Sequence, residues 1–201
     1  MATGDLTVAH SPTDLVGNHL AALSRAAHDA LPAAAIVSDW ATHLAAVFAA
    51  GGRLLACGNG GSAAEAQHLT GELVGRFRHD RQPLSAIALG ADVAATTAIL
   101  NDYGADEMFA RQVRAHGSRG DVLVAFSTSG TSPNVIAAAK AALELGITVW
   151  ALTGPAPNTL AALSDSRLAV EAPTVATVQE IHLSLVHALC LALDHALGVA
   201  G

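Results

Sequence analysis

The sequence predicts an α/β fold: a five-stranded parallel sheet with the flavodoxin-like strand order 2-1-3-4-5, covered by helices on both faces. Two observations predict it. Short apolar runs alternate along the chain with longer helical patterns, which is typical of buried parallel strands joined by crossover helices. A glycine-rich turn and a hydroxyl-rich turn each follow such a run, at the ends of strands where α/β sheets bind their ligands.

Composition indicates one domain that spans residues 1–201. The chain is 52% hydrophobic and only 13% charged, which is more apolar and less charged than most soluble proteins. No shift in composition marks a second domain. We expect the apolar excess to be buried between subunits of a homo-oligomer.

Charge and cysteine usage exclude several classes of protein. The net charge is −7 and no basic stripe is present, which argues against nucleic acid as a partner. No stretch of eighteen residues is free of polar interruption, so we expect no membrane contact. Cys57 and Cys190 lie in apolar runs and are predicted to be buried thiols of a reducing compartment. The start, residues 1–10, lacks the features of a signal peptide. A cytoplasmic location is therefore expected.

The first 50 residues are predicted to form two helices that precede any strand. Apolar residues recur at helical intervals over 12–30, with Ser11 or Thr13 as a cap, and Pro32 separates this helix from a second one over 33–50. These helices are expected to pack on the sheet or on a neighbouring subunit. Their histidines show no ligand spacing and are predicted to be structural or exposed: His19, His28 and His43.

The rest of the chain alternates strands with helices. The predicted strands cover residues 53–57, 84–89, 121–126, 147–152 and 167–171. The predicted helices cover residues 63–74, 92–100, 105–116, 133–145, 158–163 and 175–197, with a break at Asn101-Asp102-Tyr103-Gly104.

The turn after the first strand is rich in glycine. Gly58, Gly60 and Gly61 let backbone N–H groups approach a ligand, while Asn59 and Ser62 add side-chain hydrogen-bond partners at a helix start. An anion is well placed there. The spacing also fits the relaxed dinucleotide fingerprint G-x-G-x-x-A, and such turns often serve only close packing.

His68 and Glu72 share one face of the following helix because they are four residues apart. An imidazole and a carboxylate on the helix that follows an anion-binding turn indicate a site that performs proton or metal chemistry on a phosphorylated substrate. The alternative is a half-buried histidine beside a solvated glutamate.

The turn after the third strand carries five hydroxyls in six residues, Ser127 to Ser132, with Pro133 at the first helical position. Such a loop binds phosphate through hydrogen bonds, whereas an N-cap alone needs only one hydroxyl. In the order 2-1-3-4-5, the first and third strands are neighbours. Both turns are therefore expected to face one crevice.

The last helix carries Gln179 and His187, eight residues apart. They lie within about 80° around the helix but about 12 Å along it, so their side chains only just reach a common ion. A satisfied core histidine is the alternative for His187, which sits among leucines and valines.

These residues together resemble the phosphoheptose isomerases, a family of the sugar isomerase (SIS) superfamily. The resemblance rests on four motifs in order: GNGGSAAEAQHLTGELVGR at 58–76, NDYG at 101–104, STSGTSPN at 127–134 and QEIHLSLVH at 179–187. It implies conversion of sedoheptulose 7-phosphate to D-glycero-D-manno-heptose 7-phosphate through an enediol(ate), the first step toward activated heptoses. It also implies a homotetramer with sites between subunits, and it leaves open which subunit supplies each group.

The resemblance also implies a role for each matching residue. Glu72 would be the general base and His187 the acid, and a zinc ion would be held by His68, Glu72, Gln179 and His187. Because a metal lowers the basicity of its ligands, either the coordination of Glu72 changes during turnover or one of its two roles is minor. The residues expected to bind substrate are Asn59, Gly60, Gly61, Ser62, Arg76, Asp102, Ser127, Thr128, Ser129, Ser132 and Gln179.

Two other functions fit part of the sequence. A non-catalytic SIS protein that binds a phosphosugar or a replication initiator would share the glycine turn, but such relatives lack residues matching Glu72 and His187. A nicotinamide-dependent oxidoreductase rests on the glycine spacing alone, and Asp92 lies too far along the chain to serve as its ribose-binding acid.

Overall fold

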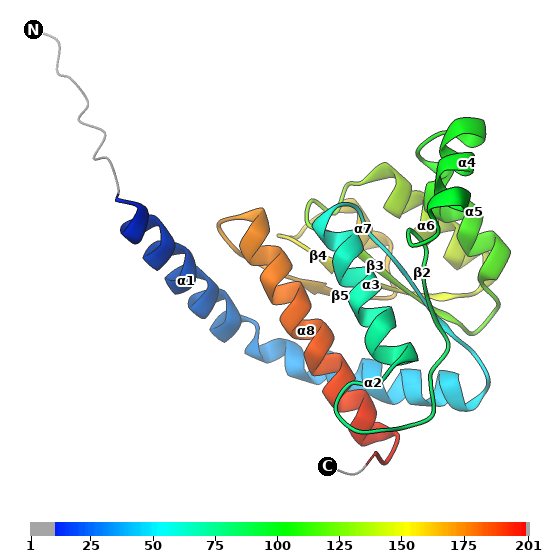
Figure 1. Cartoon of the computed structure of the whole chain (residues 1–201), viewed down its shortest axis with the longest axis horizontal. Helices are drawn as coiled ribbons and strands as arrows, with labels where there is room; N and C mark the ends of the chain where they lie inside the picture. The colour runs from blue at the N-terminus through cyan, green and yellow to red at the C-terminus, as the bar shows by residue number, and fades with distance from the viewer. Residues whose placement is uncertain (1–10, 200–201) are drawn as a thin grey trace, which may run out of the picture.

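A computed structural model describes residues 11–199, so the expectation about residues 1–10 lies outside the described part. Its centre is a parallel sheet of five strands in the order β2-β1-β3-β4-β5, which confirms the predicted topology (Figure 1). The strands are β1 (Leu54–Cys57), β2 (Ala86–Ala88), β3 (Val122–Ser127), β4 (Thr148–Thr153) and β5 (Ser166–Ala169).

Helices cover both faces of the sheet, as the continuous apolar strands predict. The chain orders them as α1 (Pro12–Asp29), α2 (Ala34–Ala49), α3 (Gly61–Val74), α4 (Val93–Tyr103), α5 (Glu107–His116), α6 (Pro133–Leu145), α7 (Thr159–Leu163) and α8 (Val175–Ala196), with a short 3-10 turn at Leu31–Ala33. Side-chain packing places α2, α3 and α8 on one face of the sheet and α5, α6 and α7 on the other.

Alternating residues of the strands feed two hydrophobic cores. In β3, Val122, Val124 and Phe126 point toward the core under α2, α3 and α8, whereas Leu123 and Ala125 point toward the core under α5 and α6. This follows from the two-residue period of a strand. The sheet is thereby fixed between two helical layers, and the turns at its carboxyl edge are held in place.

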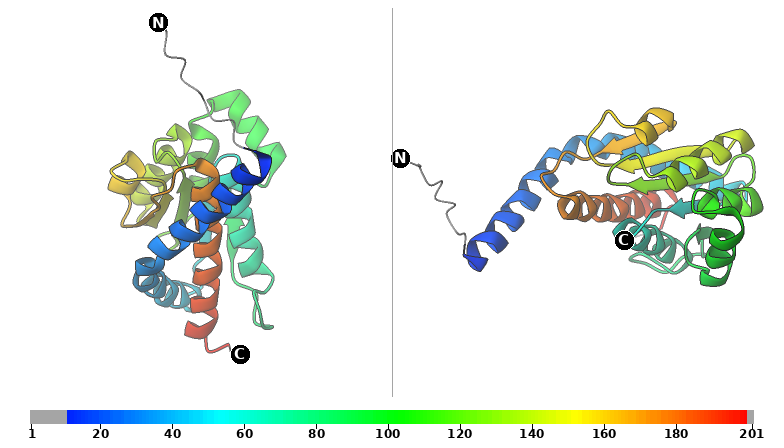
Figure 2. Two further views of the ribbon diagram at one scale, coloured as in Figure 1. Left: turned by 90° about the vertical axis from the view of Figure 1, so that its left-hand side faces the viewer. Right: turned by 90° about the horizontal axis from the view of Figure 1, so that it is seen from above.

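Helix α1 projects from the body, and its far end stands clear of the sheet (Figure 2). Ser11 caps it: the Ser11 hydroxyl accepts from the Asp14 N–H, and the Asp14 carboxylate accepts from the Ser11 backbone N–H and hydroxyl. These hydrogen bonds lower the pKa of Asp14. One polar contact ties the helix to α8, between His19 Nε2 and Glu180 Oε1 at 2.8 Å, so His19 has the structural role expected of it.

The largest difference from the predicted elements concerns Asn101, Asp102 and Tyr103. The sequence predicts a break there, but these residues form the last turn of α4 and the break falls at residues 104–106. The Gly104 N–H donates to the Leu100 carbonyl at 3.3 Å, so the glycine ends the helix and the polar residues before it remain helical.

Two helical stretches, Pro12–Ala49 and Val175–Ala196, are long and apolar enough to cross a membrane by length and composition alone. Core helices of soluble proteins meet the same criterion, and α8 packs against α2 and α3. The absence of membrane contact stays a prediction.

Candidate active site

The glycine-rich turn leads from β1 into α3. Gly60 has a φ of +57° and occupies the N-cap of α3 without a side-chain cap, a conformation that glycine adopts without strain. The N–H groups of Ser62 and Ala63 donate to the carbonyls of Asn59 and Gly60 at 3.0 and 3.1 Å. Ser62 is buried, whereas Asn59 is exposed at the mouth of the turn.

The serine-rich turn leads from β3 into α6, and its hydroxyls contact one another. Ser127 Oγ lies 3.0 Å from Ser132 Oγ and 3.4 Å from Ser129 Oγ, and Ser129 Oγ also accepts from Thr131. Ser132 is the N-cap residue of α6, yet its side chain makes no capping bond. Capping therefore does not account for the hydroxyls, which remain clustered where α6 begins.

Two asparagines join these turns. Asn59 Nδ2 donates to Asn134 Oδ1, and Asn134 Nδ2 donates to Asn59 Oδ1, both at 2.9 Å. Because β1 and β3 are neighbours, the turns lie at one edge of the sheet, as the predicted strand order requires. Asn134 belongs to the motif STSGTSPN at 127–134, but no role was predicted for it.

Gln179 reaches the start of α3 from α8. A Cβ atom added at Gly61 would lie 2.5 to 2.7 Å from the side-chain amide of Gln179, so the absence of a side chain at Gly61 makes room for that amide. Gly61 precedes His68 by seven residues, about 10 Å along the helix. This position supports contact with substrate rather than a place beside His68.

His68, Glu72 and His187 converge between α3 and α8. Their ligand atoms lie within 4.8 Å of one another. His68 Nε2 is 2.8 Å from His187 Nε2 and 3.3 Å from Glu72 Oε1. One imidazole therefore donates a hydrogen bond to the other. The spacing prediction for His68 and Glu72 holds, and His187 joins them from the other helix.

The donor set of this cluster fits zinc. Two imidazole nitrogens and a carboxylate oxygen are ordinary ligands of zinc, and three protein ligands with an open fourth position are typical of catalytic sites. Tetrahedral ligands at the usual bond lengths lie about 3.3 Å apart, close to the 2.8 and 3.3 Å that separate His68 Nε2 from His187 Nε2 and Glu72 Oε1. The Glu72 and His68 side chains are 21% and 41% exposed, so substrate can reach them.

The chain matches the family model described as SIS domain over residues 18–154. It is 65% identical over 162 residues to a phosphoheptose isomerase of Streptomyces coelicolor, covering 81% of this chain and 70% of that one. It is 44% identical to a Methylococcus capsulatus phosphoheptose isomerase, covering 93% and 98%. The solved phosphoheptose isomerase of Neisseria gonorrhoeae superposes with a TM-score of 0.85 at 43% identity, covering 92% and 100%.

The chain belongs to the phosphoheptose isomerase family of SIS-domain proteins. The family resemblance stated from the four motifs is thereby confirmed.

In this fold, the cluster of His68, Glu72 and His187 and the serine-rich turn after β3 do not line the same hollow. The open hollow around His68 and Glu72 is lined by residues of α3 and the segment after it: Ala64, Gln67, His68, Gly71, Glu72, Gly75 and Arg76. Arg76 therefore lines the same hollow as His68 and Glu72, and its role in the site stays a prediction. Glu72 lies about 16 Å along α3 from Gly61, so the cluster and the anion-binding turns belong to opposite ends of that helix.

Asp102 lies apart from the cluster and from the serine-rich turn. Its carboxylate accepts from Asn101 Nδ2 at 2.7 Å on the exposed last turn of α4. Helix α4 packs on α5 and, unusually for so apolar a helix, has no buried residue. Val93, Leu100 and Tyr103 are exposed on it.

Three contacts around the phosphoheptose isomerase cluster could not be read from the sequence. Phe77 stacks on the His187 ring with centroids 5.8 Å apart. Buried His182 donates from Nε2 to the Thr153 carbonyl at 3.0 Å, with Nδ1 3.6 Å from buried Glu65. These contacts join residues far apart in the chain, so no local sequence pattern predicts them.

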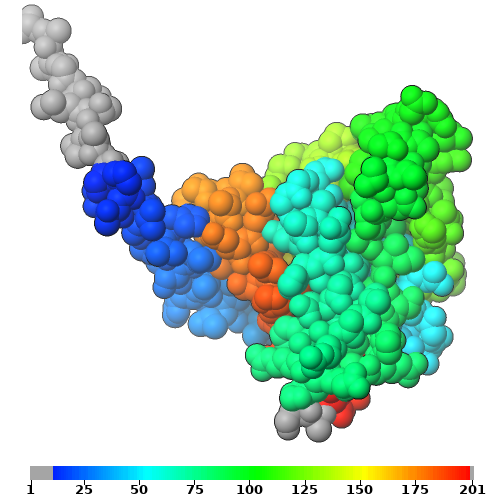
Figure 3. All heavy atoms as spheres, in the orientation of Figure 1, coloured from blue at the N-terminus to red at the C-terminus, as the bar shows by residue number. Residues whose placement is uncertain are grey.

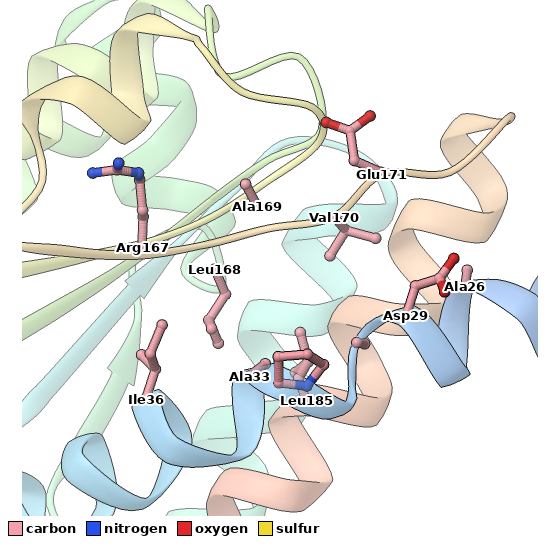
Figure 4. Close-up of a pocket in the computed structure, with 12 residues that line it drawn as sticks. Ala26, Asp29, Ala33, Ile36, Arg167, Leu168, Ala169, Val170, Glu171 and Leu185 are labelled. Carbon is pink, nitrogen blue, oxygen red and sulfur yellow. The ribbon is translucent and has the colours of Figure 1, made fainter.

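The apolar groove between α1, α2 and β5 lies elsewhere (Figure 4). It is lined mainly by Ala26, Ala33, Ile36, Leu168, Val170 and Leu185, with Asp29, Arg167 and Glu171 among its polar residues. None of the residues expected in the phosphoheptose isomerase site lines it, so we assign it no catalytic role.

Proposed function

We propose that this protein converts sedoheptulose 7-phosphate to D-glycero-D-manno-heptose 7-phosphate by proton transfer through an enediol(ate), as an early step of activated heptose biosynthesis. The observation that carries the proposal is the cluster of His68, Glu72 and His187 in a chain of the phosphoheptose isomerase family. A carboxylate beside an imidazole provides the base and the acid that an aldose–ketose isomerisation needs.

In the proposed mechanism, the serine turn holds the phosphate and Glu72 acts at the other end of the sugar. The hydroxyls of Ser127, Thr128, Ser129 and Ser132 donate to the phosphate oxygens, and those residues lie where the N–H groups of α6 begin. Asn59, Gly60, Gly61, Ser62 and Gln179 contact the sugar, with Arg76 and Asp102 as further contacts.

Glu72 removes a proton from C1 of the ketose and returns one to C2, which makes the aldose. His187 supplies the proton that the C2 carbonyl oxygen gains and takes back the proton that the C1 hydroxyl loses as C1 becomes the aldehyde. Without a bound metal, the neighbouring His68 orients His187 through the hydrogen bond between their Nε2 atoms. Each transfer is general acid–base catalysis by a positioned side chain, worth about 10²- to 10⁴-fold in rate.

We propose that His68, Glu72 and His187 hold a zinc ion, with Gln179 as a fourth ligand if its side chain leaves Gly61. When bound, zinc supplies Lewis-acid stabilisation of negative charge on the sugar oxygens. We further propose a cytoplasmic homotetramer with sites between subunits. The separation of the serine turn from the cluster and the exposed apolar residues of α1 and α4 support this assembly.

The test is an NMR assay of the purified protein with sedoheptulose 7-phosphate in deuterated water, with and without a chelator. We expect the aldose phosphate to appear with deuterium at C2, because the proton exchanges with solvent at the base. Glu72→Gln should lower the rate by about 10²- to 10⁴-fold and leave the fold intact.

The matched control is Glu144→Gln, which changes an exposed glutamate on α6 and should retain the parental rate. Full activity of Glu72→Gln would remove the proposed base. Transfer of the C1 hydrogen to C2 without uptake of solvent deuterium would point to hydride transfer instead.

A further inference from the structure

Arg81 is a buried cation between α3 and α8. It lies in the segment that joins α3 to β2, and its side chain is only 5% exposed. Its guanidinium donates to four acceptors: Asp194 Oδ1 at 3.0 Å, the Leu73 carbonyl at 2.9 Å, the Gln82 carbonyl at 3.2 Å and the Glu72 carbonyl at 2.8 Å. A buried arginine with this many partners is fixed in one orientation.

Two of these acceptors are the orphan carbonyls of the last turn of α3. The final carbonyls of a helix have no partner within it, and α3 ends at Val74. Arg81 satisfies that of Glu72 and shares that of Leu73 with the Leu84 N–H, and its charge complements the negative end of the helix dipole. The backbone of Glu72 is therefore held directly by the guanidinium.

Of the other two acceptors, the Gln82 carbonyl is next to Arg81 in the chain, and Asp194 belongs to the helix that carries His187. Asp194 lies on α8, seven residues after His187, so it points in nearly the same direction two turns further along. Its side chain is 8% exposed, and its other oxygen, Oδ2, is buried with no hydrogen-bond partner among the described residues. The Asp194 carboxylate thus depends on Arg81 for its charge partner.

We infer that Arg81, through Asp194, is a positioning residue that sets the spacing between Glu72 on α3 and His187 on α8. The inference rests on the proposed function of that cluster. The three ligand atoms come from two helices, so a small shift of either helix separates them. Groups that orient ligands in this way typically change metal affinity or activity by about 10- to 100-fold when they are removed.

Only arginine can make these contacts together. Its planar fork directs several N–H groups to fixed positions, whereas lysine offers one compact ammonium on a flexible stem. Arg81→Lys should therefore keep the charge beside Asp194 but release the carbonyls of Glu72 and Leu73. The zinc affinity and kcat of Arg81→Lys should lie between those of the parent and those of variants without a cation at this position.

The test uses the full-length protein and the double variant Arg81→Met with Asp194→Leu. Replacing both members of a buried ion pair by apolar side chains leaves no buried charge unpaired, so this variant is expected to fold. We expect its zinc dissociation constant, from competition with a chromophoric chelator, to rise about 10- to 100-fold. With saturating zinc, kcat should fall while KM for the sugar phosphate stays the same.

The matched control is Arg53→Met. Arg53 also pairs with a buried carboxylate, that of Asp121 at 3.6 Å, but at the amino edge of the sheet. It should retain parental zinc affinity and kcat even if it is less stable. A folded double variant with parental zinc affinity and kcat would overturn the inference, as would an equal loss in Arg53→Met. If the parent shows no isomerase activity, the proposed function fails, and zinc affinity still tests the spacing.

Discussion

At the scale of single residues, the reactivity of the buried thiols of Cys57 and Cys190 measures how often the core opens to solvent. Burial raises the pKa of each to about 12, and Glu72 and Asp194 add to the effect at Cys190 while Arg81 opposes it. The raised pKa favours the neutral thiol in the folded state. The contribution of each buried thiol to folding stability is therefore complete below the ordinary thiol pKa of 9.0, and it is lost as the pH rises from there toward 12.

We predict that neither thiol of the native protein reacts with a disulfide reagent such as DTNB at pH 8, because only the thiolate attacks. In denaturant both should react within the mixing time or soon after. The change in absorbance at the thionitrobenzoate band measures this directly. Rapid modification of the native protein at pH 8 would mean that the core opens far more often than this packing allows.

The site residues differ in how far the sequence could predict them. His68 and Glu72 are neighbours because helical periodicity alone sets residues four apart on one face. The convergence of His187 with them depends on how α8 packs on α3, which no local spacing encodes, and only the family resemblance suggested it. No sequence pattern predicted the role of Arg81, because its four acceptors come from three separate parts of the fold.

At the scale of elements, the turn after β1 and the turn after β3 act together because Asn59 and Asn134 pair through two hydrogen bonds. Such a pair needs a donor and an acceptor on each side chain. The link holds the turn after β1 at a fixed distance from the turn after β3.

We predict that Asn134→Asp raises KM for the sugar phosphate at least about tenfold, a loss of roughly 1.4 kcal/mol. Aspartate has the same shape but lacks the donor to Asn59 Oδ1, and its charge repels the phosphate. The thermal midpoint should change little because Asn134 is only partly buried. Steady-state kinetics over a range of substrate concentrations separates KM from kcat.

Asn134→Ala is the matched control, since it removes both hydrogen bonds but adds no charge. It should raise KM less than the aspartate does. Equal KM values for the parent and Asn134→Asp would show that the phosphate does not approach this part of α6.

The elements themselves were largely predictable, and the exceptions have physical causes. Parallel strands buried on both faces are mostly apolar, so β1, β3 and β4 stand out in the sequence, whereas the strand order was assumed from flavodoxin-like folds. β5 begins one residue earlier than predicted and ends at Ala169, because it is an edge strand with exposed Arg167 and Ala169. Burial constrains the sequence of an edge strand less than that of a central strand, so the bounds of an edge strand are harder to predict.

At the scale of the whole molecule, the surface is more apolar than one chain can explain. Leu15, Val16 and Leu20 are more than half exposed on α1, the helix that projects from the body in the space-filling view (Figure 3). Val93 and Tyr103 are equally exposed on α4. Exposed apolar faces of this kind mark contacts between protein chains, which supports the proposed homotetramer.

This assembly and the divided site lead to one prediction about the molecule as a whole. If a bound sugar takes its phosphate site from one subunit and Glu72 from another, then two inactive variants with defects in different halves should complement each other. We choose Ser129→Asp, which places a negative charge in the exposed part of the serine turn, and Glu72→Gln. Each is expected to be inactive alone for a different reason.

Subunits that assort at random form mixed pairs half of the time, and one of the two sites in each mixed pair has both halves intact. We therefore expect co-expressed variants to regain roughly a quarter of the parental activity per subunit, given two-fold related sites. Two affinity tags isolate the mixed assemblies, and the isomerase assay measures them against each variant prepared alone. Mixed assemblies no more active than the separate variants would place the serine turn and Glu72 in one chain's site.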